Sequence, residues 1–175
     1  MYKLLYWLKK HIKEKMKILL IEPYYTGSHK KWAEGLKKYS SHHVKILSMK
    51  GQFWKWRMHG GSVTLANMFN NMDWKPDLIL STDMLDLTTF LALAKIKSYG
   101  IPTAIYFHEN QISYPWSPRD RDVLNKRDNH YGFINYASAL SADKVFFNSN
   151  CHMKILLNDL KPFLKNFPDF NEINT

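Results

Sequence analysis

The chain has 175 residues, of which 45% are hydrophobic, 15% aromatic and 23% charged. At roughly 100 to 200 residues per domain this length allows one domain with a real core, and the composition excludes disordered, collagen-like and coiled-coil classes. Lysine and arginine total 25 against 15 acidic residues, a net charge of +10. This excess favours a phosphate-bearing partner such as RNA or a sugar nucleotide.

Cysteine usage and hydropathy bear on the compartment. Cys151 is the single cysteine, which excludes an internal disulfide framework and a multi-cysteine zinc site. With no secretory cleavage signal in the sequence, we expect a cytoplasmic protein. No run of about 18 apolar residues occurs, so we expect no transmembrane segment.

Residues 1–15 form a basic stretch with five lysines and one glutamate. We interpret them as an extension upstream of a single domain at residues 16–170. The alternative is an amphipathic helix that lies on a membrane surface.

From residue 16 onward, apolar runs alternate with helical patterns. Strands are predicted at residues 17–22, 44–49, 78–82, 103–108 and 145–148. Helices are predicted at residues 29–39, 62–71, 87–98, 130–142 and 152–166. This alternation predicts an α/β fold with a Rossmann-like, doubly wound parallel sheet, whose ligands bind beyond the carboxyl ends of the strands.

The loop after the first strand reads Thr26-Gly27-Ser28-His29. Gly27 permits a tight turn, and the amino end of the next helix presents N–H groups to an anion. The loop therefore suggests a phosphate site, although an ordinary turn with Ser28 as the helix N-cap would have the same sequence.

The segment Phe53-Trp54-Lys55-Trp56-Arg57 falls in the loop predicted at residues 51–61. Alternating rings and cations suit stacking on bases or sugars while phosphates are held. Packing of the tryptophans against the sheet is the alternative.

The fourth strand ends in His108, Glu109, Asn110 and Gln111. Four consecutive polar side chains at a strand's carboxyl end favour catalysis or substrate binding over a structural hydrogen-bond network.

Asp83 and Asp86 follow the third strand, and we expect them to cap the next helix.

The eight histidines form no H-x-x-x-H pair, so we expect no metal site.

Taken together, four segments resemble the tRNA-queuosine alpha-mannosyltransferase family. They are residues 21–30, 54–57, 105–111 with Tyr114 and Pro115, and 146–149. The resemblance covers roughly residues 16–170. The family is similar to GT-B glycosyltransferases, in which two Rossmann-like domains face each other across a cleft, and this chain resembles the N-terminal, acceptor-side domain.

The resemblance implies transfer of mannose from GDP-mannose to queuosine in the tRNA anticodon, with retention of configuration, no metal and no further cofactor. By motif position, Gly27, Ser28 and His29 would bind the donor diphosphate, and His108 and Glu109 would be catalytic. The implied acceptor-binding residues are Trp54, Trp56, Arg57, Asn110, Gln111 and Asp83.

The sequence departs from the family pattern in two ways. Thr26 stands where the family has a first glycine, and no donor domain follows residue 170. We therefore expect the chain to be a fragment, or a subunit whose donor domain a separate polypeptide supplies. Two alternatives stay open: an RNA-binding module without catalysis, and a half-enzyme for a lipid or polysaccharide acceptor with residues 1–15 as its anchor.

Overall fold

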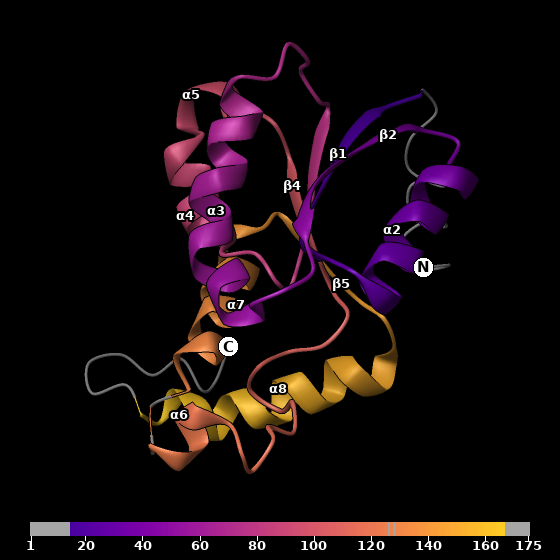
Figure 1. Ribbon diagram of the computed structural model, residues 1–175. Helices are drawn as coiled ribbons and strands as arrows, with labels where there is room; N and C mark the ends of the chain where they lie inside the picture. Colours follow the sequence, from indigo (N-terminus) through magenta and orange to yellow (C-terminus); the bar gives the residue numbers. More distant parts are fainter. Residues whose placement is uncertain (1–14, 126, 128, 167–175) are drawn as a thin grey trace.

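The structure is a computed structural model that describes residues 15–166 apart from 126 and 128. Five parallel strands form one sheet in the order β2-β1-β3-β4-β5, with helices packed around it (Figure 1). The strands are β1 (Lys17–Tyr25), β2 (His43–Lys50), β3 (Leu78–Thr82), β4 (Thr103–Phe107) and β5 (Lys144–Phe147). The predicted α/β, Rossmann-like fold is confirmed.

The crossovers are largely helical. The helices are α2 (Gly27–Tyr39), α3 (Trp54–Asn70), α4 (Leu87–Leu93), α5 (Lys95–Ser98), α6 (Arg121–Leu124), α7 (His130–Ser141) and α8 (Asn150–Leu164). Of the described helices, none combines the length and apolar character needed to cross a bilayer. The roles expected for residues 1–15 concern a segment that, except for residue 15, lies outside the described residues.

Two helix predictions were wrong in their bounds. The second helix begins at Trp54 rather than at residue 62, so the predicted loop at 51–61 is mostly helix. Its glycines suggested a turn, but Gly61 lies where α3 approaches β1, and a Cβ there would be 3.4 Å from the Pro23 Cβ. The third predicted helix divides at Ala94 into α4 and α5.

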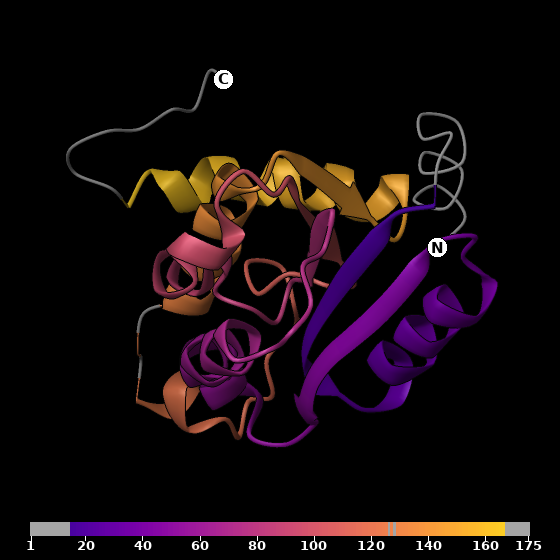
Figure 2. The same cartoon turned by 90° about the horizontal axis from the view of Figure 1, so that it is seen from above.

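The core has two layers, one on each face of the sheet (Figure 2). Alternate residues of β1 point to opposite faces. Ile18 and Leu20 pack with Leu36 of α2, whereas Leu19 and Ile21 pack in the layer that contains Phe69 of α3. All six side chains are fully buried. Burial on both faces holds the strand ends in place and thereby positions the loops that follow them.

Candidate functional site

A pocket of about 520 Å³ lies at the carboxyl ends of the strands. Open α/β sheets bind ligands at this edge where the strand order reverses, here between β1 and β3. We call it the sheet-end pocket; it is lined by Tyr24, Thr26, Gly27, Ser28, His29, Trp54, Met84, Glu109, Gln111, Tyr114, Pro115, Trp116, Ser117 and Asp120. It brings together residues from the three chemically suggestive segments of the sequence.

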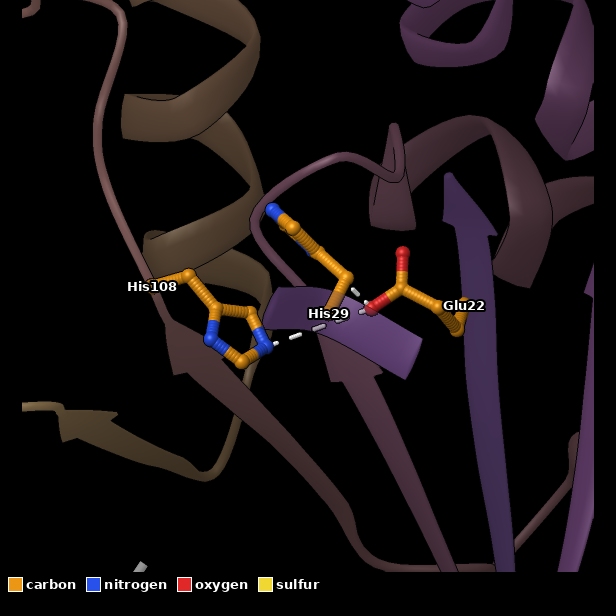
Figure 3. A group of neighbouring side chains, drawn as sticks. All are labelled: Glu22, His29 and His108. Carbon is orange, nitrogen blue, oxygen red and sulfur yellow. Dashed lines mark hydrogen bonds and ion pairs between the residues drawn. The ribbon is translucent and has the colours of Figure 1, made fainter. Parts of the chain in front are cut away.

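Three side chains meet next to this pocket (Figure 3). Glu22 of β1 is fully buried, and its Oε2 lies 3.1 Å from Nδ1 of His29, in the first turn of α2. His108, which directly follows β4, has its Nε2 4.0 Å from the same Oε2. The two imidazole rings are 4.3 Å apart. The end of β4 and the first turn of α2 thus place two histidines around one buried carboxylate of β1.

The two histidines differ in their protonation. Burial lowers the pKa of His29, but the hydrogen bond and negative charge of Glu22 outweigh burial, and the net shift is upward. Burial and the nearby His29 lower the pKa of His108 to about 3. His29 therefore forms an ion pair with Glu22 when protonated, while His108 stays neutral.

The ligand atoms of Glu22, His29 and His108 all lie within 4.8 Å of one another, so this group could hold a metal ion. Two histidines and a glutamate are a known zinc ligand set. Here, however, Glu22 Oε2 already shares a hydrogen bond with His29 Nδ1, an arrangement that satisfies both groups. The expected absence of a metal stays a prediction.

Asp83 holds the backbone of His108 in place. Its Oδ1 accepts a 2.8 Å hydrogen bond from the His108 N–H, and the side chain is buried. Burial raises the pKa of Asp83 to about 8, against the opposing effects of the His29 charge and the His108 N–H. The expected capping role belongs to Asp86, which accepts from the Thr89 N–H at the start of α4. The expected capping role of Asp83 was therefore wrong, because its carboxyl turns toward β4 instead.

Asn110 and Gln111 are buried within the loop that follows β4. The Asn110 side chain accepts from the Ile112 and Ser113 N–H groups and contacts His152 at 2.9 Å. Gln111 lines the sheet-end pocket and donates to Glu109. Asn110 thus shapes the loop, and Gln111 both shapes it and faces the pocket.

His108 and Glu109 lie between two hollows. Glu109 lines the sheet-end pocket, and both residues line a neighbouring pocket of about 320 Å³ that reaches the start of α8 at Ser149. Burial raises the pKa of Glu109. Glu109 therefore borders both hollows, whereas His108 borders the smaller one.

The amino end of α2 opens into the sheet-end pocket. Gly27, its first residue, has φ +50°, a conformation that glycine adopts without strain. The N-cap is Thr26 rather than Ser28, because Thr26 is the last residue with extended dihedrals. The first N–H groups of a helix lack intrahelical partners and favour anions. A negatively charged group fits this end of the pocket.

Lys55 links the first turn of α3, where Trp54 lines the sheet-end pocket, to the segment around α6. The Lys55 Nζ lies 2.5 Å from Asp120 Oδ1 and 2.6 Å from Asp122 Oδ2. It also lies 4.8 Å from the centroid of the Trp116 ring. These contacts fasten the segment around α6 to the first turn of α3, and Trp54 lies between the sheet-end pocket and a second pocket.

Trp56 and Arg57 face away from the sheet-end pocket. Trp56 is 72% exposed and lines the second pocket. The Arg57 Nε donates to the Lys50 carbonyl at 3.0 Å and lines neither pocket. The structure thus does not bring these two residues together with Gly27 and His108.

A known protein family matches most of this chain. The model of the family described as tRNA-queuosine alpha-mannosyltransferase N-terminal matches residues 17–175. The chain belongs to this family.

A relative of the tRNA-queuosine alpha-mannosyltransferase family supports the assignment. The tRNA-queuosine alpha-mannosyltransferase of Drosophila melanogaster is 34% identical over 154 residues, which cover 87% of this chain. The aligned part is 39% of the relative's length, so the chain spans well under half of that protein. Solved structures offer no match to this chain.

Within the region matched by the tRNA-queuosine alpha-mannosyltransferase family, three residues of the site were missed from the sequence. Glu22 directly follows the apolar run of residues 18–21 within β1, and a lone charge there is the signal that could have found it. Asn135 on α7 accepts from the Gln111 N–H and donates to the Asp83 carbonyl. Lys55 pairs with Asp120 and Asp122, which lie more than 60 positions away in the sequence. No local pattern therefore indicated that Lys55 links the start of α3 to the segment around α6.

Proposed function

We propose that this chain is the acceptor-side, N-terminal part of a retaining glycosyltransferase that moves mannose from GDP-mannose to queuosine in a tRNA anticodon. The observation that carries the proposal is the sheet-end pocket, which joins a helix N-terminus to a loop with His108, Glu109 and Gln111 within the region that matches the family. The family description and the relative's name supply the reaction.

In this proposal the amino end of α2 binds the donor diphosphate. The N–H groups of Gly27 and Ser28 face a polar pocket, and the helix dipole favours negative charge there. Protonated His29 adds a positive charge beside them. Thr26 does not obstruct this approach, because its side chain packs toward Gly51, where a Cβ would lie 2.3 Å from Thr26 Cγ2.

His108 and Glu109 would contact the transferred sugar. Neutral His108 can hydrogen-bond a sugar hydroxyl without carrying a charge, and Glu109 borders both hollows beside it. Gln111 would contact the acceptor, whereas Asp83 and Asn110 would act by positioning the loop. A donor-binding domain would complete the site.

The first test is binding of the purified chain to tRNA with and without queuosine at two salt concentrations. Tighter binding of the queuosine-containing tRNA is the expected result, because the sheet-end pocket would recognise the modified base. Equal affinities that fall together with salt would instead support a general RNA-binding module. No binding at either salt concentration would refute a tRNA acceptor site on this chain.

The exposed aromatic residues favour RNA binding without catalysis as the second candidate function. Phe53 and Trp56 are 71% and 72% exposed on a chain of net charge +10. Such rings stack on unpaired bases of any sequence. RNA affinity that ignores queuosine and survives His108→Ala would favour this candidate.

A further inference from the structure

A second pocket of about 620 Å³ lies on the other side of Trp54 and Lys55. We call it the aromatic pocket. Its rings come from the start of α3 and from the start of α7. They include Phe53, Trp56, His59, His130 and Tyr131. The tertiary structure thus joins two ring-bearing segments that are far apart in the sequence.

The apolar rings at the start of α3 in the aromatic pocket are exposed to solvent. Phe53 and Trp56 are the large apolar side chains there, and both are mostly exposed. Phe53 also has φ 54° and ψ 55°, a left-handed conformation that residues with a Cβ adopt only at a cost in free energy. An exposed ring on a strained backbone is doubly unfavourable for folding, which points to a ligand that uses the ring.

The floor of the aromatic pocket consists of flat rings. His59 and His130 are stacked, with centroids 5.1 Å apart and planes inclined by 26°. Tyr131 lies 5.4 Å from His59. Burial and then the neighbouring His130 lower the pKa of His59, so its ring is neutral at physiological pH. Flat rings beside exposed aromatics form a surface for a planar ligand.

Charge identifies the kind of planar ligand. Among the described residues, three cationic side chains line the aromatic pocket, Lys55, Arg121 and Arg127, together with the carboxylate of Asp122; Lys55 also pairs with Asp120. Arg127 is held in place by a 3.0 Å contact with Asp122. Rings for stacking beside cations for phosphate are the combination that binds unpaired nucleotides.

We propose that the aromatic pocket binds an unpaired nucleotide of the RNA acceptor, with its base stacked on Trp56 and its phosphate near Arg121 and Arg127. This rests on the proposed function, since the sheet-end pocket would hold the modified base. Trp54 lines both pockets, so neighbouring nucleotides of one loop can lie on its two sides. Such a site recognises unpaired nucleotides of the loop and does not recognise their sequence.

The test measures binding of the full chain to an RNA stem-loop, to a fully paired RNA duplex of the same length and to queuosine-containing tRNA. Trp56→Ala should weaken stem-loop and tRNA binding by roughly tenfold or more, and duplex binding much less. Trp56→Phe should retain most of the affinity. Tyr99→Ala is the matched control, because Tyr99 is an 85% exposed ring on another surface, and it should bind like the unchanged chain.

Phe53→Gly provides a second variant that tests the strained position. Glycine adopts the left-handed conformation freely, so this variant should unfold at an equal or higher urea concentration while it binds the stem-loop more weakly. Unchanged stem-loop affinity in both Trp56→Ala and Phe53→Gly would overturn the inference.

The outcomes separate this inference from the proposed function. If queuosine does not change the affinity but Trp56→Ala still reduces stem-loop binding, the aromatic pocket stands and the proposed function fails. If the unchanged chain binds none of the RNAs, both fail. Loss of binding to anionic phospholipid vesicles in Trp56→Ala, with RNA binding intact, would assign the rings to a membrane surface and overturn the inference.

Discussion

At the scale of single residues, titratable groups are buried beside the sheet-end pocket. Glu22 and Asp83 are buried, and Nε2 of His108 lies 4.0 Å from Oε2 of Glu22. Oδ2 of Asp83 and Nε2 of His108 find no hydrogen-bond partner among the described residues. Buried polar atoms without a partner reduce stability, and at a strand end they are available to a ligand.

Asp83 makes the stability of the fold depend on pH. Burial raises its pKa from 3.8 to about 8, so between these values the folded state holds a proton that the unfolded state releases. Its contribution to stability is therefore complete below the unfolded pKa and is lost as the pH rises through about 8. We expect the unfolding free energy of the wild-type chain, relative to that of Asp83→Asn, to be lower near pH 9 than near pH 5. Urea unfolding at the two pH values measures this difference.

Asparagine is the matched replacement because its amide oxygen can still accept from the His108 N–H. A stability difference between the two proteins that stays constant across this pH range would contradict the assigned protonation of Asp83.

Gly51 is required by its contact with Thr26. A Cβ at residue 51 would lie 2.4 Å from the Thr26 Cβ, so Gly51→Ala forces the two segments apart. We expect a loss of about 1 to 3 kcal/mol in unfolding free energy, as for other overpacked sites. Gly60→Ala is the control, since its Cβ meets only Trp56 Cε3 at 3.7 Å and alanine favours helix. Equal stability of the two variants would refute the contact.

At the scale of elements, α7 locks the loops that follow β3 and β4. The Asn135 side chain links the Gln111 N–H to the Asp83 carbonyl, with distances of 2.7 and 2.8 Å. Ser138 similarly accepts from the Leu87 N–H at the start of α4. One helix thus positions both strand ends of the site.

Asn135→Ala should loosen this site. It leaves two buried backbone groups without partners, at about 1 to 3 kcal/mol each, and we expect a lower midpoint in thermal unfolding together with weaker tRNA binding. Asn158→Ala, at an exposed position of α8, is the control and should change neither. A normal midpoint in Asn135→Ala would show that the linkage contributes little.

At the scale of the whole molecule, net charge governs the encounter with an anionic partner. Lysines are concentrated on α2, whose amino end opens into the sheet-end pocket, and Lys30, Lys31 and Lys38 line a further hollow of about 610 Å³ on this helix. In Figure 1, α5 lies far from α2, on the other side of the sheet. Phosphates of a bound RNA would therefore meet α2 before α5.

The salt dependence of tRNA binding tests this placement. Lys31→Gln should lower the slope of log affinity against log salt by about 1, because one phosphate contact is lost. Lys95→Gln on α5 removes the same charge and should leave the slope unchanged. Equal slopes in the two variants would mean that only net charge matters.

The amino-acid sequence by itself determined the alternation of strands and helices, the parallel sheet and the general location of the site. Continuous apolar runs such as residues 18–21 are typical of buried parallel strands, and parallel strands require crossovers. The helix at residues 130–142 was predicted within one residue of α7, and His108, Glu109 and Gln111 do border the pockets.

Only the tertiary structure decided which of these residues meet. The glycines at 60 and 61 suggested a loop, because local propensity does not register that α3 packs closely on Pro23. Asp83 and Asp86 looked alike in sequence, yet one holds His108 and the other caps α4. Glu22 with His29 and His108, and Lys55 with Asp120, depend on contacts between distant segments. The physical reason is that burial and pairing arise from packing, which no local pattern contains.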